Sequence, residues 1–186
     1  MKKLIFTLVL CVGMSGMLLA QSDNQTITLQ IPKVAMLKLV SSAPLNFTLT
    51  FGQPTSAGNK LSPVSVPAIK TYLVYSSIVN SSGTGGYRTI SVKTDVQPLD
   101  GTNLTVYAEA PASSGGGKKG VQQGLIPLST ASDILIDQIG SCYTGELVNN
   151  GHALNYGVSI PNGSAAYSTL VSGSRQYVVT YTLSEN

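Results

Sequence analysis

The sequence predicts an all-β protein, an immunoglobulin-like antiparallel β-sandwich of about 7 to 10 strands that follows a signal peptide. Short alternating runs rich in Val, Ile, Thr and Tyr recur along the 186 residues, and such alternation is typical of half-buried strands. Clusters of Gly, Pro and Asn separate these runs, as turn residues do. No stretch shows sustained helical periodicity, which favours strands throughout.

Residues 1–20 have the layout of a secretory signal peptide. Two lysines at the start precede an uncharged run that ends at Ala20, and such a segment is removed on export. We expect cleavage after Ala20 or Ser22, which leaves residues 21–186 as a single domain. No later run has the ~18 apolar residues of a membrane helix. The expected location is therefore the cell surface, the extracellular space or the periplasm.

Ten segments of the mature chain are expected to form strands. Pro32 separates the first two, because proline cannot donate a hydrogen bond to a central ladder. The Asp100-Gly101 and Asn150-Gly151 pairs supply residues that accept the backbone angles of tight turns. The expected strands are residues 25–31, 34–40, 46–51, 71–79, 87–94, 103–109, 133–139, 153–160 and 175–184, with a shorter one at 121–127.

Two segments need a separate interpretation. Residues 133–139 (DILIDQI) also fit a helix with Asp133 and Asp137 on one face, although the paired isoleucines favour a strand. Residues 113–120 (SSGGGKKG) lack the spacing of a phosphate-binding loop. We interpret them as a mobile hairpin loop, in which Lys118 and Lys119 could contact an anionic surface.

Charge and cysteine content exclude several classes of protein. Without the two lysines of the signal peptide, nine basic and eight acidic residues remain, a net charge of +1 (9 − 8). Nucleic acid, which needs a basic surface, is therefore not an expected partner. Charged residues make up only 10% of the chain, which leaves little repulsion against self-association. Cys142 alone remains after processing, so no internal disulfide forms, and we interpret it as a small buried residue rather than a reactive thiol.

Residues that carry catalytic chemistry are few and scattered. His152 is the only histidine, and beside a turn we expect it to be solvated. One histidine and one cysteine are too few for the usual zinc site, and the G-x-S-x-G motif of hydrolases is missing. The acidic residues are scattered over several predicted elements. The sequence therefore predicts no enzyme, no cofactor and no metal.

Tyrosine is the main aromatic residue, with nine copies and no tryptophan. Most tyrosines lie in predicted strands, where they are ordinary sheet residues. Tyr143 and Tyr167 lie in predicted loops and point outward more readily. They are the expected contacts if the protein binds a glycan.

The last fourteen residues, GSRQYVVTYTLSEN, resemble the end of chaperone-assembled fimbrial subunits. Gly173 stands fourteen residues from the end, and Tyr177, Val179, Tyr181 and Leu183 alternate after it. In that family a strand donated by a partner completes an unfinished sandwich. The resemblance therefore implies that these residues form an assembly strand, with self-assembly or other surface subunits as partners. A strand this apolar would be an aggregation hazard if left unpaired.

The chain also departs from the fimbrial pattern. Glu185 stands where the family has a penultimate aromatic residue, and the common cysteine pair is missing. Ile27, Leu29 and Ile31 suit either a first internal strand or a donated one. We expect an exported surface structural or adhesive subunit, fimbrial-like and non-catalytic. The alternative is a secreted carbohydrate-binding module.

Overall fold

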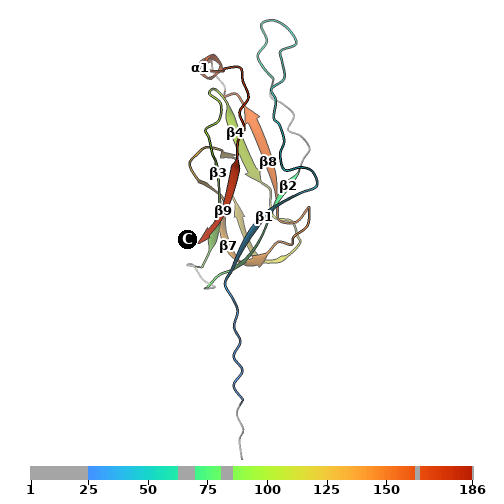
Figure 1. The fold of residues 1–186 in the computed structure, drawn as a ribbon, viewed down its shortest axis with the longest axis vertical. Helices are drawn as coiled ribbons and strands as arrows, with labels where there is room; N and C mark the ends of the chain where they lie inside the picture. The colour runs from blue at the N-terminus through green and yellow to red at the C-terminus, as the bar shows by residue number, and fades with distance from the viewer. Residues whose placement is uncertain (1–24, 63–69, 81–85, 162–163, 186) are drawn as a thin grey trace, which may run out of the picture. The chain divides into compact units, whose positions relative to one another are not determined.

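The computed structural model describes residues 25–62, 70–80, 86–161 and 164–185 (Figure 1). The chain divides into two units, Met1–Ile31 and Pro32–Asn186. The predicted signal peptide lies outside the described residues. The described part of the first unit contains no helix or strand, and all its side chains are exposed.

The described part of the second unit is an antiparallel sheet of nine strands with one short helix. Pairing follows the order β6-β4-β8-β2-β7-β3-β9, while β1 pairs with β2 and β5 with β7. The all-β prediction is confirmed. No helix in the described residues is long and apolar enough to cross a membrane. The elements are β1 (Val34–Ser41), β2 (Thr71–Ile78), β3 (Arg88–Thr94), β4 (Asn103–Ala108), β5 (Gly116–Gln122), β6 (Ile126–Pro127), β7 (Asp133–Tyr143), β8 (His152–Ser159), α1 (Ser164–Ser168) and β9 (Val179–Glu185).

Two central strands, β2 and β7, connect the rest of the sheet. β2 pairs with β1 along its whole length, with β8 at its start and with β7 near its end. β7 pairs with β3 through its first part and reaches β2 only with its last residues. Both faces of β2 are buried, with Leu73 and Tyr75 in one apolar cluster and Tyr72 and Val74 in another. This explains why TYLVYSSI is a continuous apolar run instead of a strict alternation.

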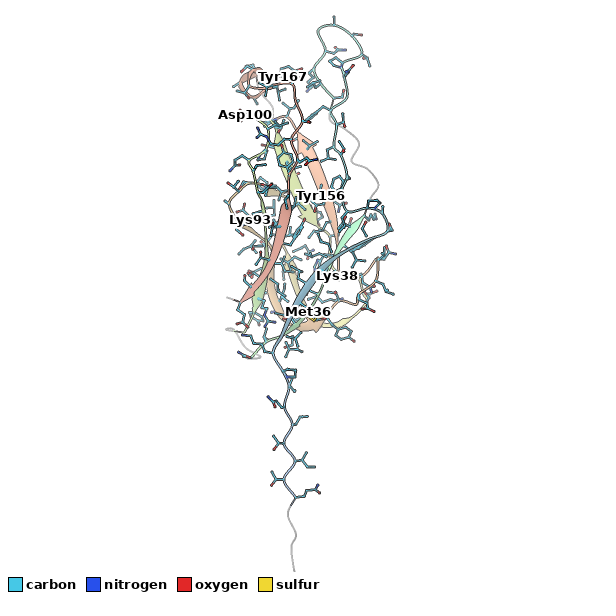
Figure 2. All side chains as sticks on the ribbon, viewed as in Figure 1. Met36, Lys38, Lys93, Asp100, Tyr156 and Tyr167 are labelled. Carbon is cyan, nitrogen blue, oxygen red and sulfur yellow. The ribbon has the colours of Figure 1, made fainter. Side chains whose placement is uncertain are left out.

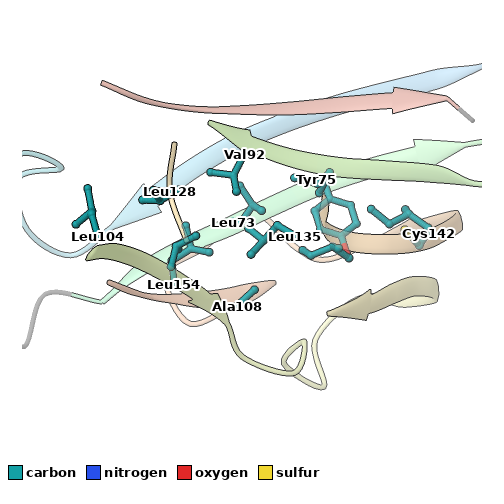
Figure 3. Close-up of a cluster of buried hydrophobic side chains, with 13 residues drawn as sticks. Leu73, Tyr75, Val92, Leu104, Ala108, Leu128, Leu135, Cys142 and Leu154 are labelled. Carbon is teal, nitrogen blue, oxygen red and sulfur yellow. The ribbon is translucent and has the colours of Figure 1, made fainter. Parts of the chain in front are cut away.

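The main core collects side chains from five strands (Figure 3). Leu73, Ile90, Leu135, Ile136 and Ile139 are fully buried in it. Each such side chain contributes about 1.5–3 kcal/mol through removal of apolar surface from water. Cys142, the cysteine of the described residues, is free, so this core and the backbone ladders carry the stability of the described fold.

Glycines explain why residues 113–120 do not form the expected loop. Gly116–Gln122 is strand β5, which lies directly against β7. Gly115, Gly117 and Gly120 have φ between +81° and +83°, a region that other residues rarely adopt. A Cβ on Gly117 would overlap Ser141 O. The interpretation as a mobile loop is therefore wrong, because the glycines allow close approach of two backbones.

Most predicted strands are confirmed, and residues 133–139 are a strand, extended to Tyr143. Two predictions are wrong, since residues 25–31 and 46–51 form no strand. In residues 46–51, the Phe47 ring packs on the Tyr156 ring, with 5.2 Å between centroids. The apolar residues of this segment therefore contact the core although the segment pairs with no strand. The predicted strand 121–127 is divided between β5 and β6, and α1 was not expected.

Replacement of Gly117 by Ala should lower the free energy of unfolding by about 2–4 kcal/mol, the range of strain and overlap together. Urea unfolding measures it. Gly124→Ala is the matched control, because nothing lies within 4 Å of its Cβ position and it has no positive φ. Equal stability of the two variants would contradict the close approach of β5 and β7.

Candidate functional site

The predicted assembly strand alternates as the sequence indicated. Tyr177, Val179, Tyr181 and Leu183 are half-buried and pack against the main core, while the residues between them are exposed. The strand itself begins at Val179, so Tyr177 precedes it. Gly173 is exposed, with nothing within 4 Å of its Cβ position. One face of β9 therefore belongs to the core and the other meets solvent.

Hydrogen bonds join this segment to neighbouring parts of the fold. β9 pairs with β3 from Val179 to Glu185. The hydroxyl of Tyr181 lies 2.5 Å from that of Tyr156 on β8, and burial raises the pKa of Tyr181 above its ordinary value. The Tyr177 hydroxyl accepts a hydrogen bond from the Leu99 N–H at 3.0 Å. One edge of β9 is thus fully used.

The other edge of β9 lies beside β1 (Figure 1) without a ladder between them. Among the described strands, β1 pairs only with β2, and β9 only with β3. We call the line between these two strands the β1–β9 seam. Five half-buried apolar side chains follow it and pack against the core: Leu37 and Leu39 of β1, and Val179, Tyr181 and Leu183 of β9. The seam therefore combines two strand edges with an incompletely covered apolar row.

Arg88 closes one end of the seam. Its guanidinium is 1% exposed; it donates hydrogen bonds to Val34 O, to Ser77 Oγ at 2.8 Å and to Glu185 Oε1 at 3.1 Å. Lys33 Nζ binds the other carboxylate oxygen of Glu185 at 2.5 Å. The hydrogen bond from Lys33, with the charge of Arg88, holds the pKa of Glu185 below its ordinary value. This cluster joins the first residues of β1 to the last of β9.

Residues 25–31, in the first unit, carry the alternation that the sequence showed. Ile27, Leu29 and Ile31 are 82%, 85% and 71% exposed. Such a row of large apolar side chains on an extended segment is unfavourable in water. The segment therefore has the pattern of a strand without the pairing of one.

His152 is not the solvated histidine that the sequence suggested. It is the first residue of β8, opposite Leu73 on β2, and it is fully buried. Its Nδ1–H donates to Glu109 O at 2.8 Å, and its Nε2 lies 2.8 Å from the Tyr75 hydroxyl. The expectation is wrong because His152 begins β8, which lies between β2 and β4 in the sheet. Burial lowers the pKa of His152, which the hydrogen bond to Glu109 partly opposes.

Cys142 and the two lysines of β5 also have contacts within the chain. Cys142 is buried, as expected, and burial raises its pKa to about 11, so it stays a thiol. Lys119 Nζ donates to Ala112 O and Ser114 O at 2.5 and 2.8 Å. Lys118 Nζ lies 3.9 Å from the centroid of the Tyr87 ring. Both lysines thus have contacts within the chain.

Two acidic residues border one hollow of about 330 Å³, which Gln123, Ile126 and Ile134 also line. Asp133 and Asp137 lie four residues apart on the same strand, and an extended strand separates such residues by about 13 Å. Paired glycosidase carboxyls lie roughly 5–9.5 Å apart across a cleft. Asp137 Oδ1 also accepts a hydrogen bond from the Gln138 N–H at 2.7 Å. The pair is therefore a poor match for that chemistry.

The two tyrosines suggested as ligand contacts lie on different elements. Tyr143 ends β7, is 59% exposed and covers Gly116. Tyr167 lies in α1, is 40% exposed and borders a second hollow. The structure gives no contact between them.

Replacement of Val179 by Asp should lower the free energy of unfolding by about 2–4 kcal/mol, because the charge would enter the half-buried row at the seam. Chemical unfolding followed by circular dichroism measures the loss. Thr180→Asp is the matched control, since Thr180 is exposed and lies opposite Lys93. It should change stability by less than about 0.5 kcal/mol. Equal losses would mean that β9 has no core face.

Stability should fall as pH drops below about 6.5, the pKa of an unfolded histidine. The pKa of His152 is lower in the folded state, so the unfolded chain binds the proton first. The stabilisation from neutral His152 is fully present above pH 6.5. As the pH falls from there to the folded pKa, this stabilisation decreases by up to ~1.4 kcal/mol per pH unit, and below the folded pKa it falls no further. Unfolding at several pH values measures it, and His152→Asn should remove this part of the slope. A titration of the wild-type ring at pH 6.5 or above would contradict the buried neutral state.

Comparisons with protein-family models, curated proteins and solved structures gave no match. The functional argument therefore depends on the geometry of the chain itself. Among the described residues, the seam has two strand edges without a ladder and an apolar row that is only half-buried.

Proposed function

We propose that this protein is an exported, non-catalytic structural or adhesive surface subunit, an immunoglobulin-like sandwich completed by a strand from a second copy. The β1–β9 seam carries this proposal. A donated strand could pair with the free edge of β1 or with that of β9, as in recognition by strand addition. It would also cover the row of five apolar side chains at the seam.

Residues 25–31 have the composition that the seam requires. Ile27, Leu29 and Ile31 share one side of an extended chain, and each would contribute about 1.5–3 kcal/mol if fully buried. Thr26, Thr28 and Gln30 occupy the other side and can face solvent. The segment contains no charge, so it can enter the seam without an unpaired buried ion.

A second copy is a better donor than the chain's own segment. To lie antiparallel beside β1, residues 25–31 would need a two-residue hairpin at Pro32-Lys33. The favoured two-residue turns need a positive φ at the first central position, whereas proline fixes φ near −65°. Insertion from another molecule avoids this turn and links copies into a chain.

The experiment compares three forms of the mature protein by native mass spectrometry and electron microscopy. Wild type should form multimers or filaments. The triple variant Ile27→Asp, Leu29→Asp, Ile31→Asp should be a folded monomer, because three charges would enter the seam. The control Thr26→Asp, Thr28→Asp, Gln30→Asp has equal added charge on the opposite side and should still assemble.

Mixing tests the direction of donation. The folded monomeric variant keeps an intact seam, so it should accept the segment of one wild-type molecule. Because the variant cannot donate a segment of its own, one variant molecule should bind at the end of each multimer and stop its growth. Three monomeric proteins of equal hydrodynamic size would contradict strand donation. Equal loss of assembly in both triple variants would mean that charge, and not the apolar row, controls association.

A further inference from the structure

A second open feature lies in the part of unit two that contains α1, away from Met36 on β1 (Figure 2). It is a wide, open hollow of about 550 Å³, a volume that falls in the range of small-ligand sites. One wall is a turn, and the other is α1. The lining residues are Gly58, Asn59, Lys60, Ser164, Tyr167 and Ser168.

Tyr167 is held in place across this hollow. Its hydroxyl accepts a hydrogen bond from the Leu61 N–H at 3.2 Å, which links α1 to the turn 106 residues earlier in the chain. The side chain nevertheless stays 40% exposed. A ring that is fixed at its hydroxyl and open on its surface loses little conformational entropy when a ligand stacks on it.

The segment around α1 packs against a turn that contains Gly101. Gly101 has a φ of +72°, and a Cβ there would overlap Ala166 O and lie 2.8 Å from Thr169 Oγ1. Thr169 Oγ1 in turn donates to Ala166 O at 2.9 Å. Close packing on this turn positions the wall that carries Tyr167.

The polar groups of the hollow define the chemistry of a ligand. Asn59 offers an amide that both donates and accepts. Ser168 Oγ donates to Ala165 O at 2.7 Å, so its lone pairs remain available to accept from a ligand hydroxyl. Lys60 is the only charged lining residue, and no ion pair to it occurs among the described residues.

We propose that this hollow binds an acidic saccharide, with a pyranose ring on Tyr167 and its carboxylate on Lys60. The apolar face of a sugar suits an exposed aromatic ring, its hydroxyls suit an amide and two serines, and a single ammonium suits a single carboxylate. This site does not depend on strand donation between copies. It would give a structural subunit a contact with an acidic glycan.

The test is a titration of ¹⁵N-labelled mature protein with trigalacturonate, followed by amide chemical shifts. Galactotriose is the neutral probe, since it lacks only the carboxylates. Trigalacturonate should shift the amides of residues 58–61 and 164–168 saturably and bind at least 5-fold more tightly than galactotriose. The monomeric triple variant of residues 27, 29 and 31 should give the same result, which separates this site from assembly.

Three variants assign the roles. Lys60→Gln should remove the preference for the acidic probe, whereas Lys93→Gln should not. Tyr167→Ala should abolish binding of both probes, while Tyr167→Phe keeps the ring and should retain most of the affinity. Tyr143→Ala should change nothing. Absence of saturable shifts, shifts only at other residues, or equal shifts with acetate alone would overturn the proposal.

Discussion

The buried Arg88 guanidinium is the interaction on which the arrangement of the first and last strands depends. A buried charge is costly unless its hydrogen bonds are satisfied, and Arg88 satisfies them with atoms of β1, β2 and β9. It therefore holds β1 and β9 close at one end, although no ladder joins them. The same interaction gives the seam a defined end.

The core supports this arrangement from the inside. Leu183 lies opposite fully buried Ile90 on β3, and Tyr181 reaches Tyr156 on β8. β9 is thus attached by its ladder and one face, while its second edge stays available. The partner strand that we propose would pair with this remaining edge.

Hydrogen bonds between buried polar groups also connect the inner strands. His152 and Tyr75 connect β8 to β2 and reach carbonyl groups of Glu109 and Lys119. The glycines of β5 let that strand lie against β7 at a distance that side chains would prevent. These features bring catalytic residue types, a histidine, a cysteine and a lysine, into structural roles. The seam and the Tyr167 hollow, in contrast, are open features of the described residues.

The sequence by itself determined the strand class, the limits of most strands and the two faces of β9. Those features follow from local alternation, so Tyr177, Val179, Tyr181 and Leu183 could be assigned without a structure. The exposure of Tyr167 could also be predicted, because a tyrosine outside the strands tends to be exposed. Alternation could not show whether residues 25–31 had a partner strand, since pairing joins residues that are distant in sequence.

Only the tertiary structure decided the roles of Arg88, His152 and the glycines of β5. Arg88 reads as one charge in a strand, and its partners lie 11 to 97 residues away. His152 reads as a loop residue, and its burial comes from β2 and the end of β4. Glycine clusters read as flexible, whereas here positive φ angles permit close backbone contact. Each role depends on long-range packing, which local composition does not encode.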